Sequence, residues 1–269
     1  MVRVLAPFVC AFTLAVCVAT PARAQSPSLL IEDMTWTEVR DAIAAGKTTA
    51  VYYAGSIEQN GPGVALGKHL FLAHYIAQKI AEQLGNALVY PTMPFAPTGD
   101  PAPEHKTGHM RFAGSVNVSD EAFGLIARGI AESARAAGFK NVVMMSDHGG
   151  GGQTALEKVA KDLEATWGPS GVHVYYIRDT YFKEKEQMRA YAAEHKIAVD
   201  SHAGFDDTSQ VMFIDREHKW IRKDKLVNDD GKGGTGVTGD QTIGTVALGE
   251  MFVGYKIKDA VDQIRSLVK

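Results

Sequence analysis

Several histidines and carboxylates stand among small residues in this chain, in patterns that could bind a metal ion. SIEQNGPGVALGKH, residues 56–69, carries Glu58 near its start and His69 at its end, and DHGGGGQ begins with Asp147 and His148. Glu58, His69 and His148 form a set of two histidines and one carboxylate, which suits Zn²⁺ or another divalent first-row metal and leaves a position for water. The spacing alone is not diagnostic, since such residues are common on protein surfaces. The pattern predicts one metal centre.

A further stretch, DSHAGFDDTSQVMF, covers residues 200–213 and places His202 before a turn of small residues. Asp206 or Asp207 then begins a predicted helix, where a carboxylate can cap free backbone N–H groups. Capping explains the aspartate better than it explains His202. The four glycines after His148 could form a flexible turn or a phosphate-binding nest, but neither G-x-G-x-x-G nor G-K-[ST] is present.

Short β-branched apolar runs alternate with longer amphipathic stretches, which is the pattern of helices covering a parallel sheet. The predicted strands are residues 48–56, 86–92, 141–146 and 172–177, and the predicted helices are residues 35–46, 70–85, 119–138, 152–168 and 255–269. In an open α/β sheet, ligands bind beyond the carboxyl ends of the strands. Glu58 and His148 each follow a strand. We therefore expect an α/β fold, with a mostly parallel central sheet flanked by helices on both faces, to bring them together.

Two stretches lack a helical or strand period. Residues 94–117 are rich in proline, glycine and histidine, and residues 226–244 contain the linker-like NDDGKGGTGVTGD. Long irregular segments inside a compact domain are usually functional lids or mobile loops. The first of them, which is rich in proline, is interpreted as a lid.

The first 24 residues have the pattern of a secretory signal peptide. A basic start at Arg3 precedes an apolar run, and Ala22 and Ala24 form an A-x-A-like cleavage site. A transmembrane anchor is the alternative, but the apolar run is short for one. We expect cleavage after Ala24, a periplasmic or secreted protein, and a single domain over residues 25–269.

Both cysteines, Cys10 and Cys17, lie in the predicted signal peptide, so the mature chain would contain neither a disulfide nor a thiolate ligand. Any metal would have to be held by His, Asp and Glu. The formal net charge of −3 argues against nucleic acid as a partner, and against an anionic membrane surface once the signal is removed.

Taken together, EQNGPGVALGKH, SDHGGGGQ and HAGFDDTS resemble, in this order, the motifs of the creatininase family of metal-dependent amidohydrolases. That family shows E-Q-H-G-P-H-x-P-L-G-x-D, N-G-H-G-G-N and H-A-G-x-x-E-T-S, and EHKTGHMRFAGSV is similar to its E-H-x-x-F-P-G-T region. The resemblance spans nearly the whole mature chain. It implies that a metal-activated water cleaves a C–N bond of a small amide, a cyclic amide or a short peptide.

Compared position by position, Glu58 and His148 match metal ligands of the family. Asn60 stands where the family has a histidine ligand, His69 where it has a bridging aspartate, and Gly150 where creatininase has a glutamate ligand. The resemblance therefore implies that one of two metal positions has lost its ligands. We expect one divalent metal per chain, with Zn²⁺ first and Mn²⁺ or Fe²⁺ as alternatives.

The resemblance also suggests roles for nearby polar residues. His202 is expected to transfer a proton to the leaving nitrogen, and Asp207 to orient His202 or its turn. Asp147 is expected to contact and orient a metal ligand without binding the metal itself, and Asn60 to donate a hydrogen bond to the substrate.

His105 and His109, in the segment 94–117, could touch the substrate or could be ordinary exposed histidines. Two other functions stay open. A non-catalytic member could use a degenerate metal site for ligand binding alone, and a serine hydrolase would need an activated serine, although no G-x-S-x-G elbow occurs. By analogy with the family we expect a homo-oligomer, such as a hexamer.

Overall fold

The computed structural model describes residues 28–199 and 201–268, together with Val2. The predicted signal peptide, with Cys10 and Cys17, otherwise lies outside the described residues, and so does Asp200. None of the described helices is both long and apolar enough to cross a membrane.

A sheet of four parallel strands forms the centre of the fold, in the order β2-β1-β3-β4. The strands are β1 (Thr49–Ala54), β2 (Ala87–Val89), β3 (Asn141–Ser146) and β4 (His173–Tyr176). All six residues of β1 and all six of β3 are buried, as expected for parallel strands covered on both faces. The register pairs Ala54 with Ser146, so the two central strands end level with each other.

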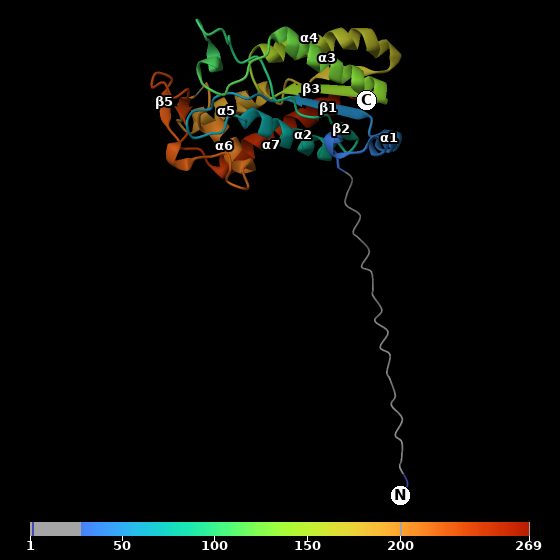
Figure 1. Cartoon of the computed structure of the whole chain (residues 1–269), viewed down its shortest axis with the longest axis horizontal. Coiled ribbons are helices and arrows are strands. Elements are labelled where there is room, and N and C mark those ends of the chain that lie inside the picture. Colours follow the sequence, from blue (N-terminus) through green and yellow to red (C-terminus); the bar gives the residue numbers. More distant parts are fainter. Residues whose placement is uncertain (1, 3–27, 200, 269) are drawn as a thin grey trace.

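Helices cover both faces of this sheet, which confirms the predicted fold class (Figure 1). One face carries α3 (Asp120–Ala137) and α4 (Gly151–Trp167), and the other carries α2 (Lys68–Leu84) and α7 (Val246–Leu267). Alternate residues of β1 enter the two apolar cores. Val51 and Tyr53 pack on the α2 and α7 side, while Tyr52 packs on the α3 and α4 side.

The helix boundaries follow from capping residues in the sequence. Thr35 begins α1 (Trp36–Ala44) with a capping box to Glu38, and Ser119 begins α3 by accepting a hydrogen bond from the N–H of Ala122. Gly85 and Gly138 end α2 and α3 in the left-handed conformation that glycine adopts most easily.

Three elements differ from the sequence predictions. The helix α5 (Phe182–Glu194) has too weak an apolar period to be predicted, because its buried positions are Glu184, Met188 and Ala192, of which the first is charged and the last is small. The helix α7 begins nine residues before the predicted start, because Thr245 caps it and Gly249 and Gly254 do not interrupt it. The linker-like segment contains a hairpin of β5 (Asn228–Asp230) and β6 (Thr238–Asp240).

The remaining helical elements complete the chain. They are α6 (Phe205–Ile214) and four 3₁₀ turns at Ile31–Asp33, Gly108–Arg111, Gly168–Ser170 and Lys223–Lys225.

The helices α6 and α7 are in close contact at Gly249. A Cβ atom there would collide with the carbonyl carbon and oxygen of Ser209 on α6. Only glycine allows this separation, so the contact sets the distance between the two helices.

We expect Gly249→Ala to lower the free energy of unfolding by about 1–3 kcal/mol, because the added methyl forces α6 and α7 apart. Gly254→Ala is the matched control on the same helix. Nothing lies within 4 Å of a Cβ at Gly254, so this change should raise stability by about 0.5–1 kcal/mol through helix propensity. Urea denaturation measures both. Equal stability of Gly249→Ala and the wild type would contradict the close contact.

Candidate active site

A polar cavity of about 260 Å³ lies beyond the carboxyl ends of β1 and β3. It is lined by the loop after β1, the start of α2, the loop after β3, the 3₁₀ turn at Gly108–Arg111, and parts of α5, α6 and α7. The lining residues are Glu58, Lys68, His69, His109, Asp147, His148, Gly149, Gly150, Tyr181, Lys185, Ser201, His202, Asp207 and Lys256.

Glu58 is the central anion of this cavity and is only 1% exposed. His148 Nε2 lies 2.7 Å from its Oε2 and His69 Nε2 lies 3.1 Å from its Oε1, while the hydroxyl of Ser56 donates to Oε2 at 3.0 Å. Burial alone would raise the pKa of Glu58, but the charges and hydrogen bonds of His148 and His69 hold that pKa well below its ordinary value. Glu58 is therefore ionised.

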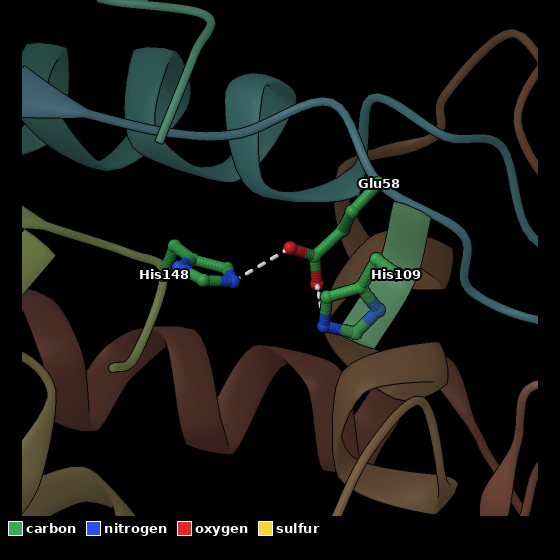
Figure 2. Close-up of side chains that lie close together, drawn as sticks. All are labelled: Glu58, His109 and His148. Atoms are coloured by element: carbon green, nitrogen blue, oxygen red, sulfur yellow. Dashed lines mark ion pairs between the residues drawn. The ribbon is translucent and has the colours of Figure 1, made fainter. Parts of the chain in front are cut away.

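Glu58, His109 and His148 form a group that could hold a metal ion (Figure 2). One possible ligand atom of each of these residues lies within 4.8 Å of those of the other two. Figure 2 shows the carboxylate of Glu58 between the two imidazole rings. The irregular segment 94–117 supplies His109 from its 3₁₀ turn.

The donor set fits a divalent ion in type and in spacing. Neighbouring ligands of a tetrahedral zinc ion lie about 3.3 Å apart when its bonds are about 2.0–2.1 Å long. The distances from Glu58 oxygens to His148 Nε2 and His109 Nε2, 2.7 and 3.8 Å, lie on either side of that value. The buried Nδ1 of His148 has no hydrogen-bond partner among the described residues, so it is free to carry the proton when Nε2 binds a metal ion.

His69, assigned to the metal from the sequence, lies between two carboxylates. Its Nδ1 is 2.7 Å from Asp147 Oδ2, and its Nε2 faces Glu58. Burial and the nearby Lys68 lower the pKa of His69, but Glu58 and Asp147 outweigh them and raise it overall. In this arrangement both ring nitrogens hold protons, so His69 orients Glu58. Metal ligation by His69 stays a prediction.

Asp147 connects this histidine to the helix behind it. Its Oδ1 accepts a hydrogen bond from Lys256 Nζ at 2.6 Å, and Tyr53 donates to the same oxygen at 3.2 Å. Burial would raise the pKa of Asp147, yet Lys256 and His69 lower it. Lys256, Asp147, His69 and Glu58 thus form a buried row of alternating charge.

His202 lies on the wall of the cavity beside His109, with ring centroids 4.5 Å apart. Its Nε2 is 2.9 Å from the carbonyl oxygen of Gln59, which can only accept, so Nε2 carries the proton. Its Nδ1 therefore has the free lone pair and lies 3.9 Å from Glu58 Oε1. Burial, with the charge of Lys68, lowers the pKa of His202 to about 4. His202 is neutral at pH 7 and can accept a proton.

Asp207 supports the turn that presents His202. Its Oδ2 accepts hydrogen bonds from the backbone N–H of Ala203 at 2.9 Å and from Lys68 Nζ at 2.7 Å. Ala203 has a positive φ of 56°, which a non-glycine residue adopts only with support. Asp207 thus orients the turn.

Two predicted site residues do not line the cavity. The amide of Asn60 donates to the carbonyl oxygens of Glu58 and Ala65, so it holds its own loop together. His105 is exposed and pairs with Asp100 at 2.7 Å. The structure brings the other predicted residues, Glu58, His69, Asp147, His148, His202 and Asp207, into one cavity.

Sequence reasoning missed five lining side chains, Lys68, Tyr181, Lys185, Ser201 and Lys256. One signal was available for Lys256. It stands three residues after Val253 and four before Ala260, on the apolar face of its helix, where a lysine is unusual. Lys68 and Lys185 carry no comparable pattern.

The comparisons with known proteins agree with one another. The family model Creatininase, described as creatinine amidohydrolase, matches residues 32–264. The creatinine amidohydrolase of Pseudomonas putida is 27% identical over 124 residues, an alignment that spans 46% of each protein. The chain thus aligns with about half the length of that relative.

Solved structures resemble the chain over most of its length. A creatinine amidohydrolase structure has a TM-score of 0.74 at 16% identity, covering 90% of this chain and 98% of that one. A mutant creatininase of the Zn-Zn type and a creatininase described as Mn each have a TM-score of 0.73 at 16% identity, covering 90% of this chain and 99% of theirs. At this identity the likeness establishes the fold.

The depressed pKa of His202 predicts a loss of stability in acid. The pKa of His202 is about 4 in the folded chain and 6.5 for an ordinary histidine. Neutral His202 therefore makes its full contribution to the free energy of unfolding above pH 6.5, and this contribution is lost as the pH falls from 6.5 to 4. Relative to His202→Gln, the metal-free wild type should lose about 2 kcal/mol of unfolding free energy between pH 7 and pH 5.

Urea denaturation of both proteins in the presence of a chelator measures this difference. Glu58, His109, Lys68 and Asp207 surround His202 and are present in both proteins, so their own titration largely cancels. Parallel stability curves between pH 7 and pH 5 would mean that His202 is not held neutral by burial.

Proposed function

The chain belongs to the creatininase family, and from this premise we propose that it is a metal-dependent amidohydrolase that cleaves the C–N bond of a small amide. Family members are hydrolases acting on C–N amide bonds. One observation carries the proposal. A buried carboxylate, Glu58, faces His109 and His148 in a cavity that also contains a neutral histidine, His202.

We propose one ion per chain, held by Glu58, His109 and His148. The positions that would complete a second site are poor in ligands, because Gly150 has no side chain and Asn60 offers only a neutral amide oxygen, its NH2 group being bonded to its own loop. Zn²⁺ suits two imidazoles and one carboxylate, and Mn²⁺ and Fe²⁺ are the alternatives.

The contact of His109 with Gln59 makes His109 the residue to test. Gln59 Nε2 lies 3.2 Å from His109 Nδ1 and also donates to Gly236 O at 2.8 Å. If Gln59 donates to His109 as well, the proton of neutral His109 lies on Nε2, facing Glu58. Ligation through Nε2 requires this proton to move to Nδ1 and the contact with Gln59 to change.

The surrounding residues supply proton transfer and orientation. A divalent ion at this place would supply Lewis acidity, which makes water a nucleophile at neutral pH and polarises a carbonyl oxygen. His202 Nδ1 is positioned to accept the proton that the attacking water loses and then to donate it to the leaving nitrogen. Asp207 fixes the turn of His202, and His69 fixes Glu58.

We expect the purified protein to hold close to one zinc ion per chain after dialysis. His109→Ala and His148→Ala should fall well below one, because each removes a ligand, while His69→Ala should stay close to one with an affinity lowered about tenfold or more. Elemental analysis measures the stoichiometry. Zinc lost in His69→Ala but kept in His109→Ala would instead make His69 the third ligand.

The same proteins test hydrolysis on a panel of creatinine, N-formyl and N-acetyl amino acids and cyclic amides. Chelation should abolish activity and zinc should restore it, and His202→Gln should lower kcat about 10²–10⁴-fold without losing zinc. His105→Ala, outside the cavity, is the control and should match the wild type. Stoichiometric zinc without hydrolysis of any amide would favour the ligand-binding alternative.

We also propose that residues 1–24 direct export and that the mature chain forms a homo-oligomer, with the leader composition and the family as support. Mass spectrometry of protein recovered from the periplasm or medium should then find Gln25 as the first residue. A chain that keeps Met1 and remains in the cytoplasm would contradict export. Light scattering of the mature protein measures its oligomeric state.

A further inference from the structure

One part of the cavity wall is rich in ammonium groups. Lys68, Lys185 and Lys256 come from α2, α5 and α7 and all line the cavity. The side chains of Lys68 and Lys256 are 1% and 2% exposed, and that of Lys185 is 19% exposed. Lysine is rarely buried to this degree, so three such groups around one small cavity need an explanation.

Each of these lysines is held by a carboxylate but keeps hydrogen-bonding capacity. Among the described residues, Lys68 donates to Asp207 at 2.7 Å, Lys256 to Asp147 at 2.6 Å and Lys185 to Asp206 at 2.5 Å. Each ammonium group therefore uses one of its three N–H donors in these hydrogen bonds.

Since Lys68 and Lys256 are nearly closed to bulk water, what fills the cavity must satisfy the remaining donors of these ammonium groups. Water or an acceptor group of a ligand could do so.

Tyr181 adds a neutral donor to the same wall. Its hydroxyl lies against Gly149, where a Cβ would collide with it, and no hydrogen bond to it is found among the described residues. Burial is the main cause that raises the pKa of Tyr181, so the hydroxyl keeps its proton. A carboxylate or another small anionic group is the ligand that such a combination of donors binds best.

The charges of the site favour an anion once the metal is counted. Glu58, Asp147 and Asp207 on the wall, with Asp206 behind Lys185, are balanced by the three lysines and by His69. Burial raises the pKa of the neighbouring Glu184 to about 7, so this fifth carboxyl is only partly ionised at neutral pH. A divalent ion therefore adds positive charge that the protein does not fully offset.

The volume limits the size of the ligand. The cavity volume of about 260 Å³ lies just below the usual range for ligand pockets, roughly 300–1,000 Å³. Such a cavity suits a small molecule better than a long peptide.

We propose that the substrate is a small amide that bears a carboxylate close to the scissile C–N bond, and that Lys185 and Tyr181 bind this carboxylate. The proposal rests on the proposed function and specifies its substrate class. Lys68 and Lys256 hold Asp207 and Asp147 in place and contribute positive charge to the same wall.

The test compares two ligands of equal size and different charge, N-acetylglycine and N-acetylglycinamide. Their dissociation constants are measured by NMR titration of the zinc-loaded protein at pH 7. The acid should bind at least tenfold more tightly than the amide. In Lys185→Gln this ratio should fall at least fivefold, and in Tyr181→Phe at least twofold.

Lys183→Gln is the matched control, since Lys183 lies on the same helix and also pairs with an aspartate, Asp259, but does not line the cavity. Its ratio should equal that of the wild type. Removing Lys185 leaves the buried Asp206 without its partner, so circular dichroism must first show that Lys185→Gln is folded. If Lys185→Gln does not fold, Tyr181→Phe, which keeps the packing, tests the proposal instead.

Equal binding of acid and amide by the wild type would overturn the proposal and leave the proposed hydrolysis untouched. A preference that survives unchanged in both variants would overturn it too, because the carboxylate would then be held by the metal. Because the titration needs no turnover, a protein that shows the predicted preference but hydrolyses no amide would refute the proposed function alone.

Discussion

The burial of one carboxylate, that of Glu58, determines how the site is built. An ionised group with 1% exposure is stable only if hydrogen bonds and opposite charges replace its water, and His148, His69 and Ser56 do this. The charge of buried His69 is in turn compensated by Asp147, and that of Asp147 by Lys256. Removing one member of a buried ion pair costs about 3–5 kcal/mol, because the other charge is left without compensation.

This dependence joins parts of the chain that are far apart in the sequence. The loop after β1 carries Glu58, the first turn of α2 carries His69, the loop after β3 carries Asp147, and the last helix carries Lys256. The sheet brings the two loops together because β1 and β3 pair in register up to Ala54 and Ser146. The fold and the charge row therefore support each other.

Much of this arrangement is predictable from local sequence patterns. The strand at residues 141–146 is predicted with its observed bounds, since a fully buried parallel strand is an unbroken apolar run. Glu58 and His148 are recognisable because each follows such a strand. Their motifs, together with HAGFDDTS, also indicate the family.

The remaining parts depend on contacts that no local pattern contains. His109 belongs to an irregular segment, and its place beside Glu58 follows from hydrogen bonds such as that of Gln59 N–H to Ser115. Asn60 turns back to its own loop, where its amide donates to the carbonyl oxygens of Glu58 and Ala65. The lysines of the cavity are buried by charge pairing, which apolar periodicity does not describe. The contact at Gly249 has a consequence for how this protein could evolve. Because it fixes the spacing of α6 and α7, which carry Asp207 and Lys256, new specificities would arise more readily through insertions or substitutions in the irregular segment 94–117, which also lines the cavity.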